Sequence, residues 1–211
     1  MPKREVYFAQ PPIELIRQWM DHQGWYNRDS KEKEFKKIED IILISAMGPP
    51  GGGRSPITGR LQRHYNYLTY TDLESESISM IFEKILGRFF NSFESDVKDN
   101  LKKLVEATKT VYTGVQNKLK PTPNKSHYTF NLRDISKIFQ GTCSAHQKTI
   151  QTKVQLLQLW YHENLRVFSD RMINEDDKDV LKELIFTESE RNFQVTKEMV
   201  LDRERIIFGD Y

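Results

Sequence analysis

The stretch ISAMGPPGGGRSPITGRLQRHYN, from Ile44 to Asn66, is the part of the chain that says most about its fold. It continues an uninterrupted apolar run that starts at Ile41, which is typical of a strand buried on both faces. Five glycines and three prolines between Gly48 and Gly59 then end the strand, because neither residue type continues regular structure well. The pattern predicts a buried strand that leads into a glycine-rich loop.

Three arginines, Arg54, Arg60 and Arg63, follow the predicted strand at its carboxyl end. Open α/β sheets bind their ligands at this end, and guanidinium groups there favour an anion such as phosphate. The loop is not a P-loop, since Gly48 to Ser55 reads GPPGGGRS and the chain has no Gly-Lys-Ser or Gly-Lys-Thr. Taken alone, the stretch indicates either an irregular surface loop or an unusual phosphate site.

The composition indicates a soluble globular chain of one or two domains, with 211 residues of which 37% are hydrophobic and 29% charged. A net charge of +2 argues against a nucleic-acid or anionic-membrane surface. No apolar run approaches the ~20 residues of a membrane helix.

The single cysteine, Cys143, excludes an internal disulfide and favours a reducing compartment, cytoplasmic or ciliary. Cys143 and His146 make a poor zinc pair, so no metal site is predicted.

The first half of the chain predicts a helix, a hairpin and two strands. Pro11 and Pro12 suit a first helical turn, and an apolar stripe through Met20 follows before Gly24 ends the helix. Residues 25–40 are aromatic and then highly charged, as in an exposed hairpin or loop. A second short strand is expected over residues 65–70.

Beyond Asp72 the apolar spacing becomes helical throughout. Residues 78–93 and 97–115 predict two antiparallel helices, capped by Ser75 or Ser77 and by Ser95 or Asp96. Asn131 with Asp134 is close to a capping box. Further helices are expected over residues 149–172 and 178–185. A domain boundary is therefore expected near Leu73.

Four motifs occur in an order that resembles the third AAA+ module of an axonemal dynein heavy chain. They are QPPIELIRQWMDHQGWY (Gln10 to Tyr26), the stretch quoted above, KPTPNKSHYTFNLRDISKIFQG (Lys120 to Gly141) and LWYHENLRVFSDRM (Leu159 to Met172). In that family Met-Pro follows the Walker B aspartates, so Met1 and Pro2 are expected to lie just downstream of them. The chain would then lack both Walker A and Walker B.

The resemblance implies a mostly helical fold in three parts. Residues 1–73 would be the end of the large α/β subdomain, with the pre-sensor hairpin, sensor strand, arginine loop and last strand of a P-loop-type sheet. Residues 74–200 would be the all-helical lid subdomain. Residues 201–211 would be a linker toward the next AAA+ module.

The resemblance also assigns roles to particular residues. Arg60 or Arg63 would be the arginine finger toward the neighbouring module, with Arg63 favoured because it directly precedes the second strand. Arg133, in NLRD, would be the sensor II residue. A cation in the first turn of a helix opposes the helix dipole, and such a broken local rule often marks function. Gly48 occupies the position of the sensor I residue, which is usually polar in AAA+ modules. Arg54 or Ser55 would therefore have to take over the role of that residue.

The implied function is that of the parent, an ATP-driven, minus-end-directed microtubule motor of cilia and flagella. Its expected location is the cytoplasm, the cytoskeleton and the axoneme. ATP or ADP with Mg would bind only in the full module, so this chain alone is not expected to hydrolyse ATP. The expected partners are the adjacent AAA+ modules, dynein intermediate and light chains and microtubules, with no nucleic acid and no membrane.

Two other functions stay open on the sequence. One is a truncated, non-catalytic helical interaction or assembly module, which exposed apolar area would favour. The other is a nucleic-acid binder that uses the arginines and the lysines between Lys31 and Lys37, which would require binding with a steep salt dependence.

Overall fold

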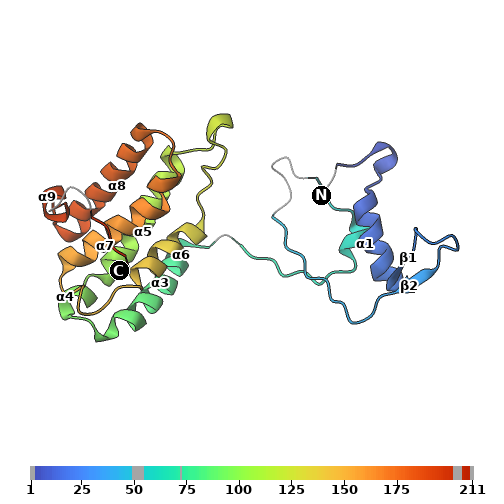
Figure 1. Cartoon of the computed structure of the whole chain (residues 1–211), viewed down its shortest axis with the longest axis horizontal. Helices are drawn as coiled ribbons and strands as arrows, with labels where there is room; N and C mark the ends of the chain where they lie inside the picture. The colour runs from blue at the N-terminus through green and yellow to red at the C-terminus, as the bar shows by residue number, and fades with distance from the viewer. Residues whose placement is uncertain (1–2, 49–54, 72, 202–205, 210–211) are drawn as a thin grey trace. The chain divides into compact units, whose positions relative to one another are not determined.

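The computed structural model describes residues 3–48, 55–71, 73–201 and 206–209, and helices dominate it (Figure 1). The chain forms two compact units, an N-terminal unit of residues 1–71 and a helical unit of residues 72–211. One two-stranded sheet is present among the described residues, and it lies in the N-terminal unit. This confirms the expected fold class, a small α/β portion followed by an all-helical portion. No helix among the described residues has the length and apolarity to cross a membrane.

The N-terminal unit is built around α1, Pro11–His22, with the 3-10 turn η1, Val6–Phe8, before it. Prolines occupy the first helical positions, as predicted. The helix ends because Gln23 takes the left-handed conformation, with φ at 56°, and donates its N–H to the carbonyl of Trp19. Ile13 and Trp19 form the buried face of the helix. Gly24, expected to stop the helix, instead begins the next strand.

The hairpin expected between Trp25 and Asp40 is present. Strand β1, Gly24–Tyr26, pairs antiparallel with β2, Phe35–Lys37. A side chain at Gly24 would overlap the Lys36 carbonyl, so the close approach of the strands requires glycine. The indole of Trp25 donates to the Leu15 carbonyl at 2.7 Å, which ties the hairpin to α1.

Both further strands predicted for this unit are wrong. Residues 41–47 form no regular structure, and Ile42 and Ile44 are 87% and 94% exposed. Residues 65–70 are also irregular, with Leu68 81% exposed. A strand buried on both faces needs neighbouring strands at its edges and a layer over each face. The described residues of the N-terminal unit supply neither, so these apolar residues lie in irregular segments, largely exposed.

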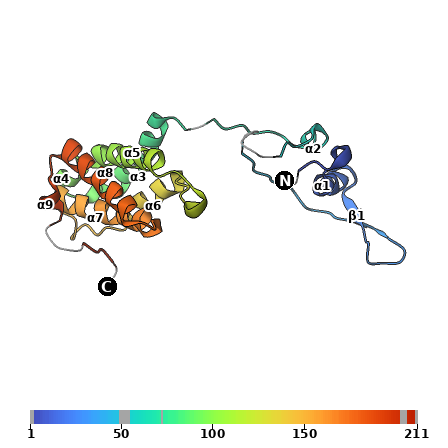
Figure 2. The ribbon, with the colours of Figure 1, turned by 90° about the horizontal axis from the view of Figure 1, so that it is seen from above.

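The helical unit carries all the remaining helices except α2, Gly59–Gln62 (Figures 1 and 2). α5 packs against α3 and α8, and α6 packs against α7. The elements are α3 (Ser75–Phe89), η2 (Phe90–Ser92), α4 (Ser95–Lys98), α5 (Leu101–Lys118), η3 (Pro123–Lys125), α6 (Leu132–Thr142), α7 (Lys153–Val167), η4 (Ser169–Arg171), α8 (Glu175–Phe193) and α9 (Lys197–Val200).

The two helices predicted over residues 78–115 are present, but their details differ. α3 buries Phe82 and Leu86, whereas Ile81 and Ile85 of the predicted stripe are 42% and 49% exposed. The second predicted helix is divided between α4 and α5. The predicted caps at 75 or 77 and 95 or 96 are wrong, since Glu74, Glu94 and Asn100 precede these helices without a capping side chain. The carbonyls of these three residues accept the first backbone hydrogen bonds of their helices, from the N–H groups of Ile78, Val97 and Leu104.

The later helices follow the prediction more closely. The capping box of Asn131 and Asp134 at the start of α6 is confirmed. The helix expected over residues 149–172 is shorter as α7, and starts at a capping box of Thr152 and Gln155. The helix expected over residues 178–185 is longer as α8. Trp160 of α7 is fully buried at the centre of the unit and donates to the hydroxyl of Thr108 in α5 at 2.8 Å.

Gly141 marks a close contact between α6 and α7. A side chain there would overlap the carboxylate of Glu163, whose side chain is 7% exposed and pairs with Arg166 at 2.6 Å. We expect Gly141→Ala to lower the free energy of unfolding by about 2 kcal/mol in urea titrations, because the buried carboxylate must move.

Gly87→Ala in α3 is the matched control, because a side chain there meets open space. This change is expected to raise the free energy of unfolding by about 0.5 kcal/mol through helix propensity alone. Equal effects of the two substitutions would contradict the close contact of α6 with α7.

Candidate functional site

The short helix α2 carries one candidate arginine and positions the other. Leu61 of α2 is only 2% exposed and anchors the helix on the N-terminal unit. Arg60, also in α2, is exposed. Among the described residues its guanidinium has no hydrogen-bond or ion-pair partner. Arg60 is therefore a positive charge available to a ligand.

Arg63, directly after α2, is held by an ion pair. Its Nη2 lies 2.8 Å from Oδ1 of Asp21, near the end of α1. Arg17 lies 2.8 Å from the other oxygen of Asp21 and 2.7 Å from Glu14. Two guanidinium groups thus face two carboxylates. The cluster is locally neutral, and Arg63 reaches another anion only by sharing or leaving Asp21.

The Asp21 carboxylate is the centre of this cluster. Burial disfavours its ionised form, but the hydrogen bond and charge of Arg63, with His64 and Arg17, lower its pKa below the ordinary value. The ring of His64 lies 3.2 Å from the same oxygen that binds Arg63. Asp21 therefore stays ionised at neutral pH and fixes the start of the segment that follows α2.

The glycine-rich loop contributes less to the described structure. Gly48 and Ser55 are half-buried, and the Ser55 hydroxyl has no hydrogen bond among the described residues. Arg54 lies outside the described residues. The Pro56 carbonyl accepts a hydrogen bond from Gln10 at 3.2 Å, which ties the end of the loop to the start of α1.

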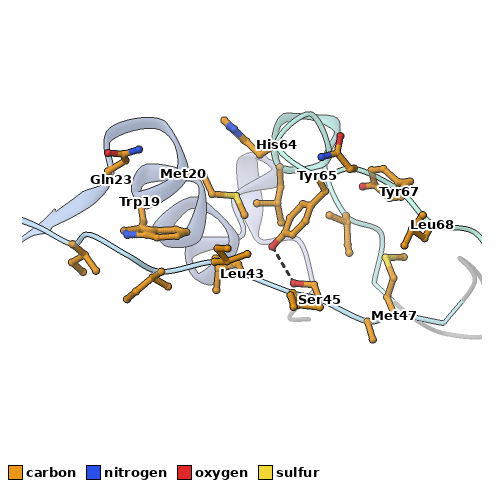
Figure 3. Close-up of a pocket in the computed structure, with 18 of the residues that line it drawn as sticks. Trp19, Met20, Gln23, Leu43, Ser45, Met47, His64, Tyr65, Tyr67 and Leu68 are labelled. Atoms are coloured by element: carbon orange, nitrogen blue, oxygen red, sulfur yellow. Dashed lines mark hydrogen bonds between the residues drawn. The ribbon is translucent and has the colours of Figure 1, made fainter.

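A large open pocket lies in the same unit, with a volume of about 1300 Å³ (Figure 3). α1 contributes Trp19 and Met20, and the irregular segments 38–47 and 64–70 supply most of the remaining wall. The hydroxyls of Ser45 and Tyr65 lie 3.1 Å apart in it. Neither Arg60 nor Arg63 lines this pocket. Its chemistry suits apolar side chains and not phosphate.

Arg133 lies in the first turn of α6 in the helical unit. Its backbone N–H donates to the side chain of Asn131 at 2.9 Å, while the Asn131 N–H donates to the Asp134 carboxylate at 3.0 Å. This capping box fixes the backbone of the first turn. The Arg133 guanidinium is exposed and has no partner among the described residues. Like Arg60, it presents an uncompensated charge from a fixed backbone.

Sequence reasoning missed two ion pairs that join residues far apart in the chain. Asp21 lies 42 positions from Arg63, and Asp134 lies 37 positions from Arg171, its partner at 3.1 Å. Only the spacing of Arg17 and Asp21, four residues apart on one helix face, gave a local signal. The structure brings Arg60 and Arg63 together on one short segment, and it places Arg133 in the other unit.

A second polar cluster ties η3 to the start of α8. Asp177 accepts hydrogen bonds from Lys125 and from the Tyr128 hydroxyl, the latter at 2.8 Å. The hydrogen bond from Lys125 lowers the pKa of Asp177 below its ordinary value, against the opposing effect of burial. The Tyr128 hydroxyl also accepts the Ile173 N–H at 3.0 Å.

The pH dependence of stability tests this cluster. A lowered carboxylate pKa stabilises the fold above the ordinary value of 3.8, and this contribution is lost as pH falls through the native pKa. We expect Asp177→Asn to lower the free energy of unfolding at pH 7, and the difference from the unsubstituted chain to shrink below pH ~4. Asp170→Asn is the control, at an exposed aspartate without a partner among the described residues, and should leave the free energy of unfolding at pH 7 unchanged.

Comparisons with known proteins cover both units. The family model described as the P-loop containing dynein motor region matches residues 1–73, and that of the AAA+ lid domain matches residues 104–202. The chain is 46% identical to human dynein axonemal heavy chain 1 and 42% identical to mouse dynein axonemal heavy chain 3, and both matches cover the whole of this chain. It spans 5% of the length of these relatives. Matched from end to end, the chain belongs to the axonemal dynein heavy chain family, as a segment of the AAA+ motor region.

Proposed function

We propose that this chain supplies the nucleotide-responsive arginines of the third AAA+ module in an axonemal dynein motor. The observation that carries the proposal is that Arg60 and Arg133 each present an exposed guanidinium, without a partner among the described residues, from a fixed backbone. Guanidinium groups bind phosphate oxygens strongly through charge-assisted hydrogen bonds. Both arginines lie where the resemblance places groups that contact nucleotide.

The two arginines act on different nucleotides in this proposal. Arg60 contacts the phosphates bound by the preceding module, and Arg133 contacts those bound by its own module. The ion pair of Arg63 with Asp21 favours Arg60 over Arg63 as the finger. Gly48, Arg54 and Ser55 remain candidates for the sensor I region. Residues 1–73 act as part of the large subdomain, residues 74–200 as the lid, and residues 201–211 as the linker.

The exposed guanidinium groups of Arg60 and Arg133 fit phosphate, whereas magnesium calls for oxygen ligands such as carboxylates. Among the described residues, no three His, Cys, Asp or Glu side chains converge as metal ligands. Magnesium and the β-phosphate would be held by Walker groups, which this sequence lacks. The chain alone would therefore not hydrolyse ATP. As part of a heavy chain it would serve a microtubule motor of the axoneme, beside other AAA+ modules and with intermediate and light chains.

Calorimetric titration with ATP and ADP tests the proposal. It compares this chain with a longer chain that restores the Walker segments, each with and without Arg133→Ala. We expect only the longer chain to bind nucleotide. Arg133→Ala should weaken ATP binding about tenfold and ADP binding less, since a charged hydrogen bond to phosphate is lost.

Arg88→Ala is the control, because Arg88 is an exposed lid arginine without a partner among the described residues. It should leave both affinities unchanged. Tight ATP binding by the short chain, or an unchanged ratio of ATP to ADP affinity in Arg133→Ala, would contradict the proposal.

A further inference from the structure

We infer that Arg171 is the positioning residue for Arg133, an inference that rests on the proposed function of Arg133. Arg171 ends η4, directly after α7, and reaches the opposite side of the capping box that starts α6. Its Nη1 lies 3.1 Å from Oδ1 of Asp134, and the other oxygen of that carboxylate accepts the Asn131 N–H at 3.0 Å. One carboxylate therefore connects Arg171 to the turn that carries Arg133.

The same guanidinium also holds the chain segment that leads into α6. Nη2 of Arg171 donates to the carbonyls of His127 and Thr129, at 3.0 and 3.2 Å. The guanidinium carbon lies 5.2 Å from the centre of the Phe130 ring, which it covers. Nε2 of the His127 ring in turn donates to the Arg171 carbonyl at 2.9 Å. Five contacts thus fix residues 127–134 to Arg171 at the end of η4.

The burial of Asp134 makes this arrangement depend on Arg171. The Asp134 side chain is 4% exposed, while that of Arg171 is 33% exposed. Without Arg171, the carboxylate would be a buried charge paired only with the Asn131 N–H, and ionised carboxylates are costly to bury unpaired. The first turn of α6 would then open, and the Arg133 guanidinium would lose its fixed origin.

Lysine does not replace arginine in this role. Arg171 satisfies one carboxylate and two carbonyls with one planar fork, whereas an ammonium group is a single point donor. Arg171→Lys retains a charge for Asp134 and releases the carbonyls of His127 and Thr129. This substitution should preserve the fold of the helical unit while loosening the turn that carries Arg133.

Amide hydrogen exchange on this chain tests the positioning directly. We expect Arg171→Lys and Arg171→Gln to raise the exchange rates of the Asn131 and Arg133 amides about tenfold, because local opening becomes easier. Arg166→Gln is the matched control, since Arg166 also pairs with a buried carboxylate, that of Glu163. It should leave both amides unchanged. Unchanged exchange in Arg171→Lys would overturn the inference, whatever the fate of Arg171→Gln.

A double-mutant cycle in the longer chain tests the consequence for nucleotide. Arg171→Lys is expected to lower the preference for ATP over ADP about fivefold when Arg133 is present, and not at all in Arg133→Ala. An equal loss in both backgrounds would overturn action through Arg133. If Arg133→Ala alone leaves the preference unchanged, the proposed function fails, and the exchange experiment still decides whether Arg171 positions the turn.

Discussion

Arg60→Ala is expected to weaken ATP binding at the site shared with the preceding module about thirtyfold, because a charged hydrogen bond to phosphate is removed. Arg63→Ala should have the smaller effect, since Arg63 already pairs with Asp21 at 2.8 Å. The measurement is a titration of ATP against a chain that contains the preceding module and this one. ADP affinity should change less than ATP affinity if the contact is to the terminal phosphate.

Arg28→Ala is the control for this experiment. Arg28 is exposed between β1 and β2 and has no side-chain partner among the described residues. Its removal changes net charge as much as the removal of Arg60 does. If the two substitutions weaken ATP binding equally, the effect of Arg60→Ala comes from the change in net charge, and the assignment of Arg60 as the arginine finger is wrong. If Arg63→Ala has the larger effect, Arg63 is the finger in spite of its ion pair.

Trp160→Ala should lower the free energy of unfolding of the helical unit by about 4 kcal/mol, near the upper end for a single substitution. Trp160 is fully buried in α7, and its indole satisfies the Thr108 hydroxyl of α5 at 2.8 Å. The substitution removes a large apolar contact, leaves a cavity and takes away a buried donor. Urea unfolding followed by circular dichroism measures the loss.

Two further substitutions separate these contributions. Trp160→Phe keeps most of the apolar contact and removes the indole donor. It should lower the free energy of unfolding by about 1.5 kcal/mol. Ile85→Ala removes an apolar side chain that is 49% exposed on α3, and should cost less than about 1 kcal/mol. A cost for Trp160→Ala no larger than that of Ile85→Ala would contradict the placement of Trp160 at the centre of the core.

The features that the sequence predicted well depend on residues close together in the chain. α1 begins at its prolines, and the capping box of Asn131 and Asp134 starts α6 as expected. Both signals operate within one helical turn, where the side chain and its backbone partner are neighbours by construction. The helical spacing beyond Asp72 likewise indicated an all-helical unit. These local rules located the elements, although not every boundary.

The features that could not be predicted depend on distant partners. The apolar run at Ile41 to Ile44 predicts a buried strand, but burial requires neighbours that the run itself cannot specify. Spacing also failed to show which face of α3 is covered, because apolar residues lie on two sides of that helix. The pairs of Arg63 with Asp21 and of Arg171 with Asp134 link residues 42 and 37 positions apart. No rule of sequence spacing reaches so far.

The irregular segment 41–47 also bears on how the purified chain behaves at high concentration. It reads IILISAM, without charge or proline, and its residues expose unpaired backbone groups and apolar side chains. Such a segment is a template for strand pairing between molecules, because a second copy can supply the hydrogen bonds that are missing. Glu39 and Asp40 precede it and oppose stacking by charge repulsion. Aggregation into cross-β fibrils should therefore accelerate when both charges are removed, as in a chain that carries Glu39→Gln and Asp40→Asn.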